Sequence, residues 1–225
     1  MKSFIGFLIL TLTVFQSIFS QTTVNLDLQK NSYLSINGTT NLLSFNLHQD
    51  GNKFVKNNLT FIASQNQNKL FLSQNQLAIE VKNFTSDNIM VLKDFQKLLK
   101  SDIYPSMQVQ LNYIELLPNT SQSKIVKGNA LVNITITGVT KKFTIPISSN
   151  SEGDIFIVDG KKDINIRDFG LTPPEEMLGL LKVSEWINID FHLNCKISVQ
   201  KPLLEANTEA NETNSRKSTL GYYIK

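Results

Sequence analysis

The side chains best suited to chemistry in this sequence are few: two histidines, His48 and His192, and one cysteine, Cys195, among 225 residues. A structural zinc site usually takes four Cys or His ligands, and a cysteine nucleophile needs a positioned histidine base. Three such residues largely exclude both arrangements. We therefore expect no metal site, no catalytic residue and no cofactor, and we expect the protein not to be an enzyme.

Carboxylate pairs offer no better catalytic arrangement. Glu175 and Glu176 are adjacent, and such acids in a polar loop are usually solvated, as Asp163 and Asp168 would also be. Catalysis by two carboxylates requires environments that separate their pKa values, and nothing in the sequence indicates one. The tripeptide Asp168-Phe169-Gly170 occurs in kinases, but the glycine-rich loop, strand lysine and His-Arg-Asp loop that accompany it there are missing. Its glycine instead predicts a turn.

The charge balance excludes nucleic acid as an expected partner. Lys plus Arg is 22 and Asp plus Glu is 19, which gives a net charge of +3. This excess is too small to attract a polyanion. With 41% apolar and 18% charged residues, the chain can bury a large core, and an all-β unit of this length is normally one domain.

The two ends of the chain differ from the rest. Lys2 precedes an apolar run from Phe4 to Phe19 that ends at Ser20, which is typical of a secretory signal peptide over residues 1–20. The run is short and carries polar residues, so we expect no stable membrane span. The protein is expected to be exported, to the periplasm or the extracellular space. Residues 201–225 are rich in Asn, Thr, Glu and Ser and predict a flexible polar tail.

Alternation with period two dominates residues 21–200 and predicts at least eight strands, each with one apolar face. From Ile187 to Val199, seven apolar residues of one parity alternate with polar ones. His192 has the outward parity of this strand, and Cys195 has the inward parity, which predicts a buried and inert thiol. Short polar turns between the runs favour antiparallel neighbours.

Helices are expected at two places only. Val91, Leu92, Phe95, Leu98 and Leu99 recur at helical spacing, which predicts a helix over residues 88–100 with Asp87 as its N-cap. A second, short helical turn is predicted over residues 175–181, after a Pro-Pro pair.

Antiparallel strands with one apolar face can close into a barrel or pack as a sandwich. On the pattern alone, an interior filled by side chains is the more usual outcome. The alternative is a barrel with an apolar lumen that holds a ligand. An enzyme acting on a lipid in such a lumen would need a buried polar cluster, and the inward positions supply only scattered Thr, Asn and Tyr.

Four segments, taken in order, resemble the YceI-like family of exported, lipocalin-like proteins that bind polyisoprenoids or similar lipids. They are residues 32–41 (SYLSINGTTN), 77–110, 128–147 (GNALVNITITGVTKKFTIPI) and 164–193. The resemblance as a whole spans roughly residues 33–199. The resemblance implies an all-β fold, an eight-stranded antiparallel lipocalin-like barrel with one short helix packed near it, over residues 21–200.

The resemblance also implies that the lumen holds an apolar ligand, an isoprenoid or acyl chain, without transforming it. The rival hypothesis is a structural or stress-response barrel whose interior is filled by its own side chains. The residues expected to line the lumen are apolar positions of inward parity and one helix residue: Phe45, Phe61, Ile79, Phe95, Val109, Leu111, Tyr113, Ile134, Ile136, Phe143, Ile145, Ile187, Ile189, Phe191 and Leu193.

Overall fold

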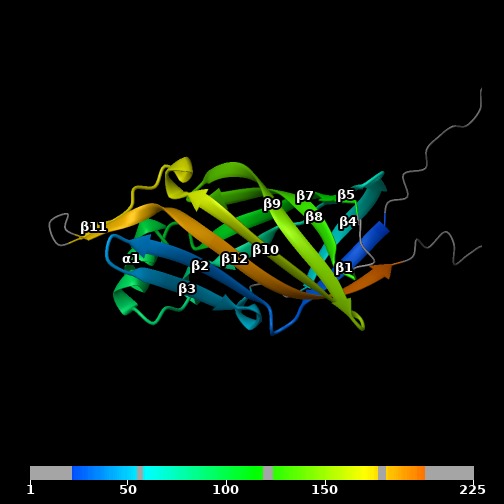
Figure 1. The fold of residues 1–225 in the computed structure, drawn as a ribbon, viewed down its shortest axis with the longest axis horizontal. Coiled ribbons are helices and arrows are strands. Elements are labelled where there is room, and N and C mark those ends of the chain that lie inside the picture. The colour runs from blue at the N-terminus through cyan, green and yellow to red at the C-terminus, as the bar shows by residue number, and fades with distance from the viewer. Residues whose placement is uncertain (1–21, 55–57, 119–123, 177–180, 201–225) are drawn as a thin grey trace, which may run out of the picture.

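A computed structural model describes residues 22–54, 58–118, 124–176 and 181–200 (Figure 1). The predicted signal peptide and the predicted polar tail lie outside the described residues. The elements in chain order are β1 (Thr22–Leu28), β2 (Tyr33–Thr40), β3 (Ser44–Asp50), η1 (Gly51–Lys53), β4 (Asn58–Asn66), β5 (Lys69–Ser73), β6 (Leu77–Glu80), η2 (Val81–Asn83), α1 (Ile89–Leu98), β7 (Ser106–Leu116), β8 (Val126–Ile136), β9 (Val139–Glu152), β10 (Ile155–Asn165), η3 (Ile166–Phe169), β11 (Glu175–Glu176) and β12 (Leu181–Gln200).

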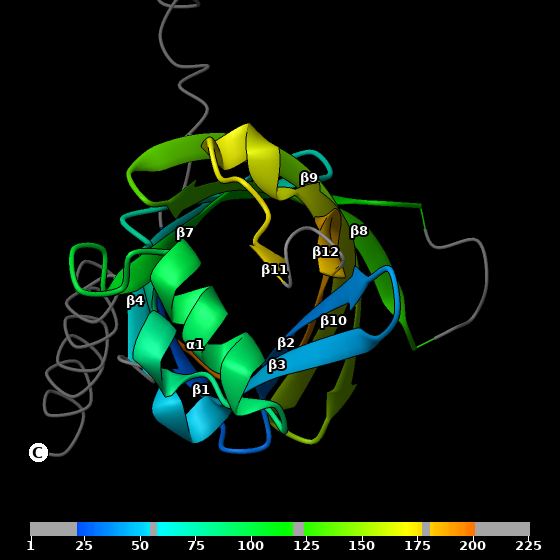
Figure 2. The same cartoon turned by 90° about the vertical axis from the view of Figure 1, so that its left-hand side faces the viewer.

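The strands form a closed antiparallel ring of eight, as predicted. Its order is β1-β4-β5-β7-β8-β9-β10-β12, and pairing of β12 with β1 closes it. The long strand β12 makes this possible, because β2 pairs with its first half and β1 with its second half. β1 and β2 therefore follow one another along the same neighbour, and β3 extends the wall beside β2. Figure 2 shows the ring end-on, with α1 lying across part of its opening.

Where two short strands pair one after the other with the same longer strand, a side chain at the junction between them bonds to the backbone of the longer strand. Between β1 and β2, the Ser32 hydroxyl accepts a hydrogen bond from the Asn194 N–H at 2.9 Å. Between β5 and β6, the Asn75 amide donates to the Leu111 carbonyl at 2.7 Å and accepts from the Leu111 N–H at 2.7 Å. These bonds replace the ladder bonds that a continuous strand would have supplied.

Within the described residues, the one α-helix lies inside the predicted range of 88–100, but its N-cap differs. The N-cap is Asn88 and not Asp87, because the Asn88 side chain accepts hydrogen bonds from the N–H groups of Met90 and Val91. Phe95 of this helix packs edge-on against Phe84, with ring centroids 5.2 Å apart. The helix is thereby fixed to the segment that follows β6.

The predicted helical turn at residues 175–181 is wrong in its described part. Glu175 and Glu176 form the short strand β11, which pairs with Lys182 and Leu181 at the start of β12. The preceding turn instead holds η3, which ends at Gly170 with φ +71°. A glycine reaches this left-handed conformation without strain, so the turn expected at Gly170 is confirmed.

Candidate functional site

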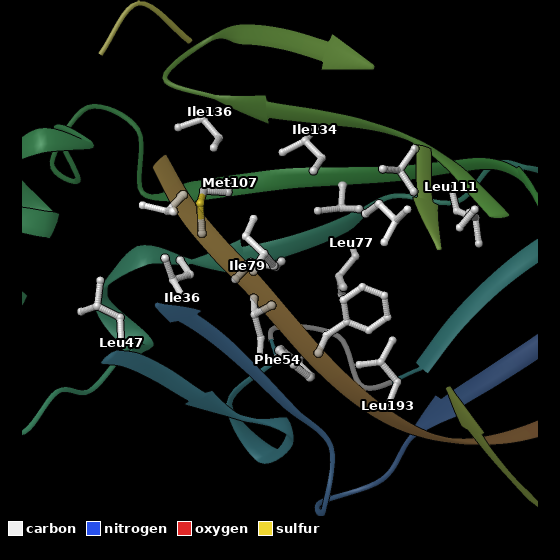
Figure 3. Close-up of a pocket in the computed structure, with 18 of the residues that line it drawn as sticks. Ile36, Leu47, Phe54, Leu77, Ile79, Met107, Leu111, Ile134, Ile136 and Leu193 are labelled. Carbon is white, nitrogen blue, oxygen red and sulfur yellow. The ribbon is translucent and has the colours of Figure 1, made fainter. Parts of the chain in front are cut away.

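A cavity of about 660 Å³ lies inside the ring. All eight strands of the ring, together with β2, β3, β6 and α1, contribute side chains to it, and nearly all of these side chains are apolar. Figure 3 shows Ile36, Ile79, Met107, Ile134 and Leu193 converging on this space from different strands. A cavity of this size is typical of a site for a small molecule.

Thirteen of the fifteen side chains predicted to face the lumen line the cavity. They are Phe45, Phe61, Ile79, Phe95, Val109, Leu111, Ile134, Ile136, Ile145, Ile187, Ile189, Phe191 and Leu193. The period of two places the twelve that lie on strands correctly, because each strand has one face toward the interior and the other toward solvent. Phe95 is placed by the helical spacing of α1.

Tyr113 is the first exception, and it does not line the cavity. The register of β7 against β8 shifts between Leu111 and Tyr113, so a bulge reverses the parity of the strand there. Beyond the bulge, Ile114 takes the inward position. Tyr113 contacts Phe71 with ring centroids 5.6 Å apart, and Lys69 Nζ lies 5.0 Å from its ring centroid.

Phe143 is the second exception. It is directly opposite the inward-facing Val132, but η3 covers this part of the wall and the Phe143 ring packs against Phe169 at 6.0 Å. β9 and β10 pair only as far as Ile147 and Gly160, so η3 packs where the two strands separate. Phe143 therefore belongs to the packing beneath η3.

Several lining residues were not predicted. Residues 155–158 are all apolar, and the alternation of Ile155 and Ile157 suggests these two as the inward face of the strand. Phe156 and Val158 line the cavity from β10 instead. Met90 and Asp94 line it from α1. Met90 is also 60% exposed, so the cavity reaches the surface beside the first turn of the helix. We call this region, lined by Thr40, Asn88, Met90, Asp94 and Ser184, the mouth.

Cys195 also lines the cavity and is buried, with 3% of its surface exposed, as its inward parity predicts. Burial raises the pKa of its thiol to about 12, because the thiolate would lose its hydration in an apolar interior. The thiolate is the nucleophilic form, so this environment suppresses the reactivity of Cys195.

A hydrogen-bonded chain of catalytic residue types, which the sequence did not reveal, lies on the outer face. Ser35 Oγ lies 3.1 Å from Nδ1 of His48, whose Nε2 lies 2.9 Å from Oδ1 of Asp50. Ser35 and His48 are directly opposite in the β2–β3 ladder, on the face away from the cavity. Ser35 is only 9% exposed, so the chain of hydrogen bonds joins two strands and does not present an accessible nucleophile.

His192 faces outward, as predicted. Its Nδ1 lies 2.6 Å from Oδ1 of Asp159, and its ring stacks on Tyr33 with centroids 5.4 Å apart. Both histidines are therefore held on the outer wall and neither reaches the cavity.

Ion pairs also lie on the outer wall. Lys161 Nζ is 2.7 Å from Asp190, and the hydrogen bond and charge of Asp190 raise the pKa of Lys161. Lys196 and Asp154 are 2.6 Å apart, and each shifts the pKa of the other toward its charged form. Exposed pairs of this kind contribute little stability, but they show which face of each strand meets solvent.

Within the described ranges, no group of three or more His, Cys, Asp or Glu residues is arranged to hold a metal ion. The described part of the chain also has no helix that is both long and apolar enough to cross a membrane.

Solved structures that resemble this fold include the following two. The structure of Burkholderia cenocepacia BcnA matches with a TM-score of 0.54 and 17% sequence identity, covering 76% of this chain and 99% of that one. A polyisoprenoid-binding domain from Saccharophagus degradans, implicated in plant cell wall breakdown, matches with a TM-score of 0.52 and 12% identity, covering 78% and 98%. At these identities the likeness shows a shared fold.

No curated protein is significantly similar to this sequence. The sequence profile of the YceI-like domain, in contrast, matches residues 15–195, which is most of the chain. The residues that this match covers include nearly the whole ring of strands, the mouth and almost the whole lining of the cavity. The chain belongs to the YceI-like domain family.

Proposed function

We propose that this protein is an exported carrier that holds an isoprenoid or acyl chain in its barrel and releases it chemically unchanged. The observation that carries the proposal is the apolar cavity of about 660 Å³, which extends through the ring and reaches the surface at the mouth. The solved domain from Saccharophagus degradans, described as polyisoprenoid-binding, supports the choice of ligand class.

The lining sets a minimum length for the ligand. Burial of an apolar group contributes about 0.8 kcal/mol per methylene, whereas association costs about 4 to 15 kcal/mol. One five-carbon isoprene unit, at about 4 kcal/mol, would barely offset this cost. Three or more units, or an acyl chain of similar length, would bind with useful affinity.

Binding of this kind needs no catalytic residue. The cavity lining is nearly all apolar, and the Ser35–His48–Asp50 chain is on the other side of the wall. We therefore propose a binding protein and not an enzyme. The alternative is a structural barrel that holds no ligand.

The test is mass spectrometry of lipids extracted from protein purified from its native host. We expect a long-chain apolar lipid in near-stoichiometric amount. A matched sample of an Ile189→Trp variant, in which the cavity is obstructed, should contain much less. If the unmodified protein carries no lipid, and purified isoprenols of three or more units do not bind it in solution, the structural-barrel alternative is favoured.

Export is tested separately. N-terminal sequencing of the protein recovered outside the cytoplasm should begin at or near Gln21, with residues 1–20 removed. Recovery of protein that retains Met1 in a membrane fraction would contradict cleavage and favour an N-terminal anchor.

A further inference from the structure

The polar side chains of the described cavity lining lie in two places. Thr40, Asn88, Asp94 and Ser184 lie at the mouth, and Asn75 and Gln76 lie at the junction of β5 and β6. At the end of the cavity farthest from α1, the lining residues that the structure describes are all apolar, among them Val24, Leu70 and Ile197. A ligand with one polar head and one long apolar chain therefore finds most of its polar partners when its head is at the mouth.

Asp94 is the one residue with a charged side chain in the described lining. It is half-buried on α1, one helical turn from Val91 and from Leu98, which also line the cavity. The described part of the chain supplies its carboxylate with no hydrogen-bond or ion-pair partner. The neighbouring Lys93 and Lys97 are exposed and do not line the cavity.

The other polar groups at the mouth are partly occupied. The Thr40 hydroxyl accepts from the Leu43 N–H at 2.8 Å and donates to the Leu43 carbonyl. The Ser184 hydroxyl accepts from the Trp186 N–H. The Asn88 side-chain oxygen accepts hydrogen bonds from the N–H groups of Met90 and Val91 in the first turn of α1. These two donors are therefore not available to an anionic ligand.

We infer that the mouth selects lipids whose head is neutral or cationic and donates hydrogen bonds, such as an alcohol, amide or amine, over lipids with a carboxylate or phosphate head. The inference rests on the proposed carrier function. A hydroxyl can donate to the Asp94 carboxylate, which accepts only. A phosphate or carboxylate head would meet this acceptor, and the described lining holds no cation to compensate for its lost hydration.

The test compares two pairs of ligands with the same chain: geranylgeraniol with geranylgeranyl monophosphate, and hexadecanol with hexadecanoate. We expect the anionic member of each pair to bind about tenfold more weakly, because its head is repelled by the Asp94 carboxylate. The difference is no larger because solvent partly screens this repulsion. Asp94→Asn should remove most of this difference, because the anionic member of each pair then binds more tightly. The control is Asp168→Asn, which removes the same charge from an exposed position on η3 that does not line the cavity.

The outcomes separate the two proposals. If no member of either pair binds, the carrier function fails. If alcohol and phosphate bind equally well, or if Asp94→Asn and Asp168→Asn have the same effect, the carrier stands and the selectivity of the mouth is contradicted. Thermal unfolding checks that the variants fold, and Asp94→Ser provides a second neutral replacement if Asp94→Asn does not.

Discussion

The ring of Phe191 lies flat over the backbone of Gly160, its direct partner across the β12–β10 ladder. A Cβ atom at Gly160 would be only 2.3 Å from Cζ of this ring. Phe45 and Gly38 repeat the arrangement between β3 and β2, with a separation of 2.2 Å. In both pairs the glycine lets a large ring lie against the wall and leaves the centre of the cavity open.

Gly160→Ala should therefore move the Phe191 ring toward the cavity. The overlap is large enough that the ring or the backbone must shift, at a cost of about 1 to 3 kcal/mol in unfolding free energy. We expect weaker uptake of a C15 or C20 isoprenol, measured by titration, together with a lower melting temperature. The double variant Gly160→Ala/Phe191→Leu should recover much of the isoprenol uptake and much of the melting temperature. If neither is recovered, Gly160 acts through something other than the Phe191 ring.

Ile189→Phe tests whether the cavity is open space. Ile189 lines the cavity from β12. In an open cavity the larger side chain should reduce isoprenol uptake at little cost in stability, whereas in a filled core it would destabilise by about 1 to 3 kcal/mol. The matched control is Ile157→Phe on β10, which does not line the cavity and should leave uptake unchanged. Strong destabilisation by Ile189→Phe, in a protein that takes up no isoprenol, would contradict an open cavity.

Asn75→Ala should weaken the wall between β5 and β6. It leaves both the N–H and the carbonyl of Leu111 without their partner, which should lower the unfolding free energy by about 1 to 3 kcal/mol in a denaturant titration. Asn68→Ala is the control, because its exposed amide donates a single bond to Leu116 and its loss should have a much smaller effect. Equal effects of the two variants would argue against a special role for Asn75.

Cys195 should react slowly with thiol reagents while the protein is folded. A rise in pKa from 9.0 to about 12 lowers the thiolate fraction at pH 8 by about a thousandfold, before steric exclusion is counted. The folded protein should react orders of magnitude more slowly than the denatured chain. Fast labelling of the folded protein at pH 8 would mean that the thiol is accessible.

The same shift of pKa gives a pH dependence of stability. Between pH 9 and pH 12 the unfolded chain has lost the Cys195 proton while the folded protein retains it, so the contribution of this group to the unfolding free energy falls as pH rises. Cys195→Ser should make this slope shallower in unfolding experiments over that range. An unchanged slope would contradict the raised pKa.

Much of the lumen could be predicted because β-strands have a period of two. Once one residue of β12 faces inward, Ile187, Ile189, Phe191 and Leu193 all must, and the sequence shows this by their alternation with polar residues. The same reasoning fails at Tyr113, since a bulge adds one residue without any mark in the pattern. It also fails at residues 155–158, where every position is apolar and either parity fits the pattern.

The sequence by itself determined the strand-rich fold, a helix within residues 88–100 and which apolar faces of most strands turn inward, because these depend on local periodicity. Only the tertiary structure decided that the apolar faces enclose a cavity. The space left between these faces depends on the distance between the walls of the ring and on the positions of the Phe45 and Phe191 rings. The tertiary structure also decided that Asp94 belongs to the mouth. A charged residue in an amphipathic helix is normally solvated, and its place at the cavity follows from how α1 lies across the ring, which depends on contacts between residues distant in the sequence.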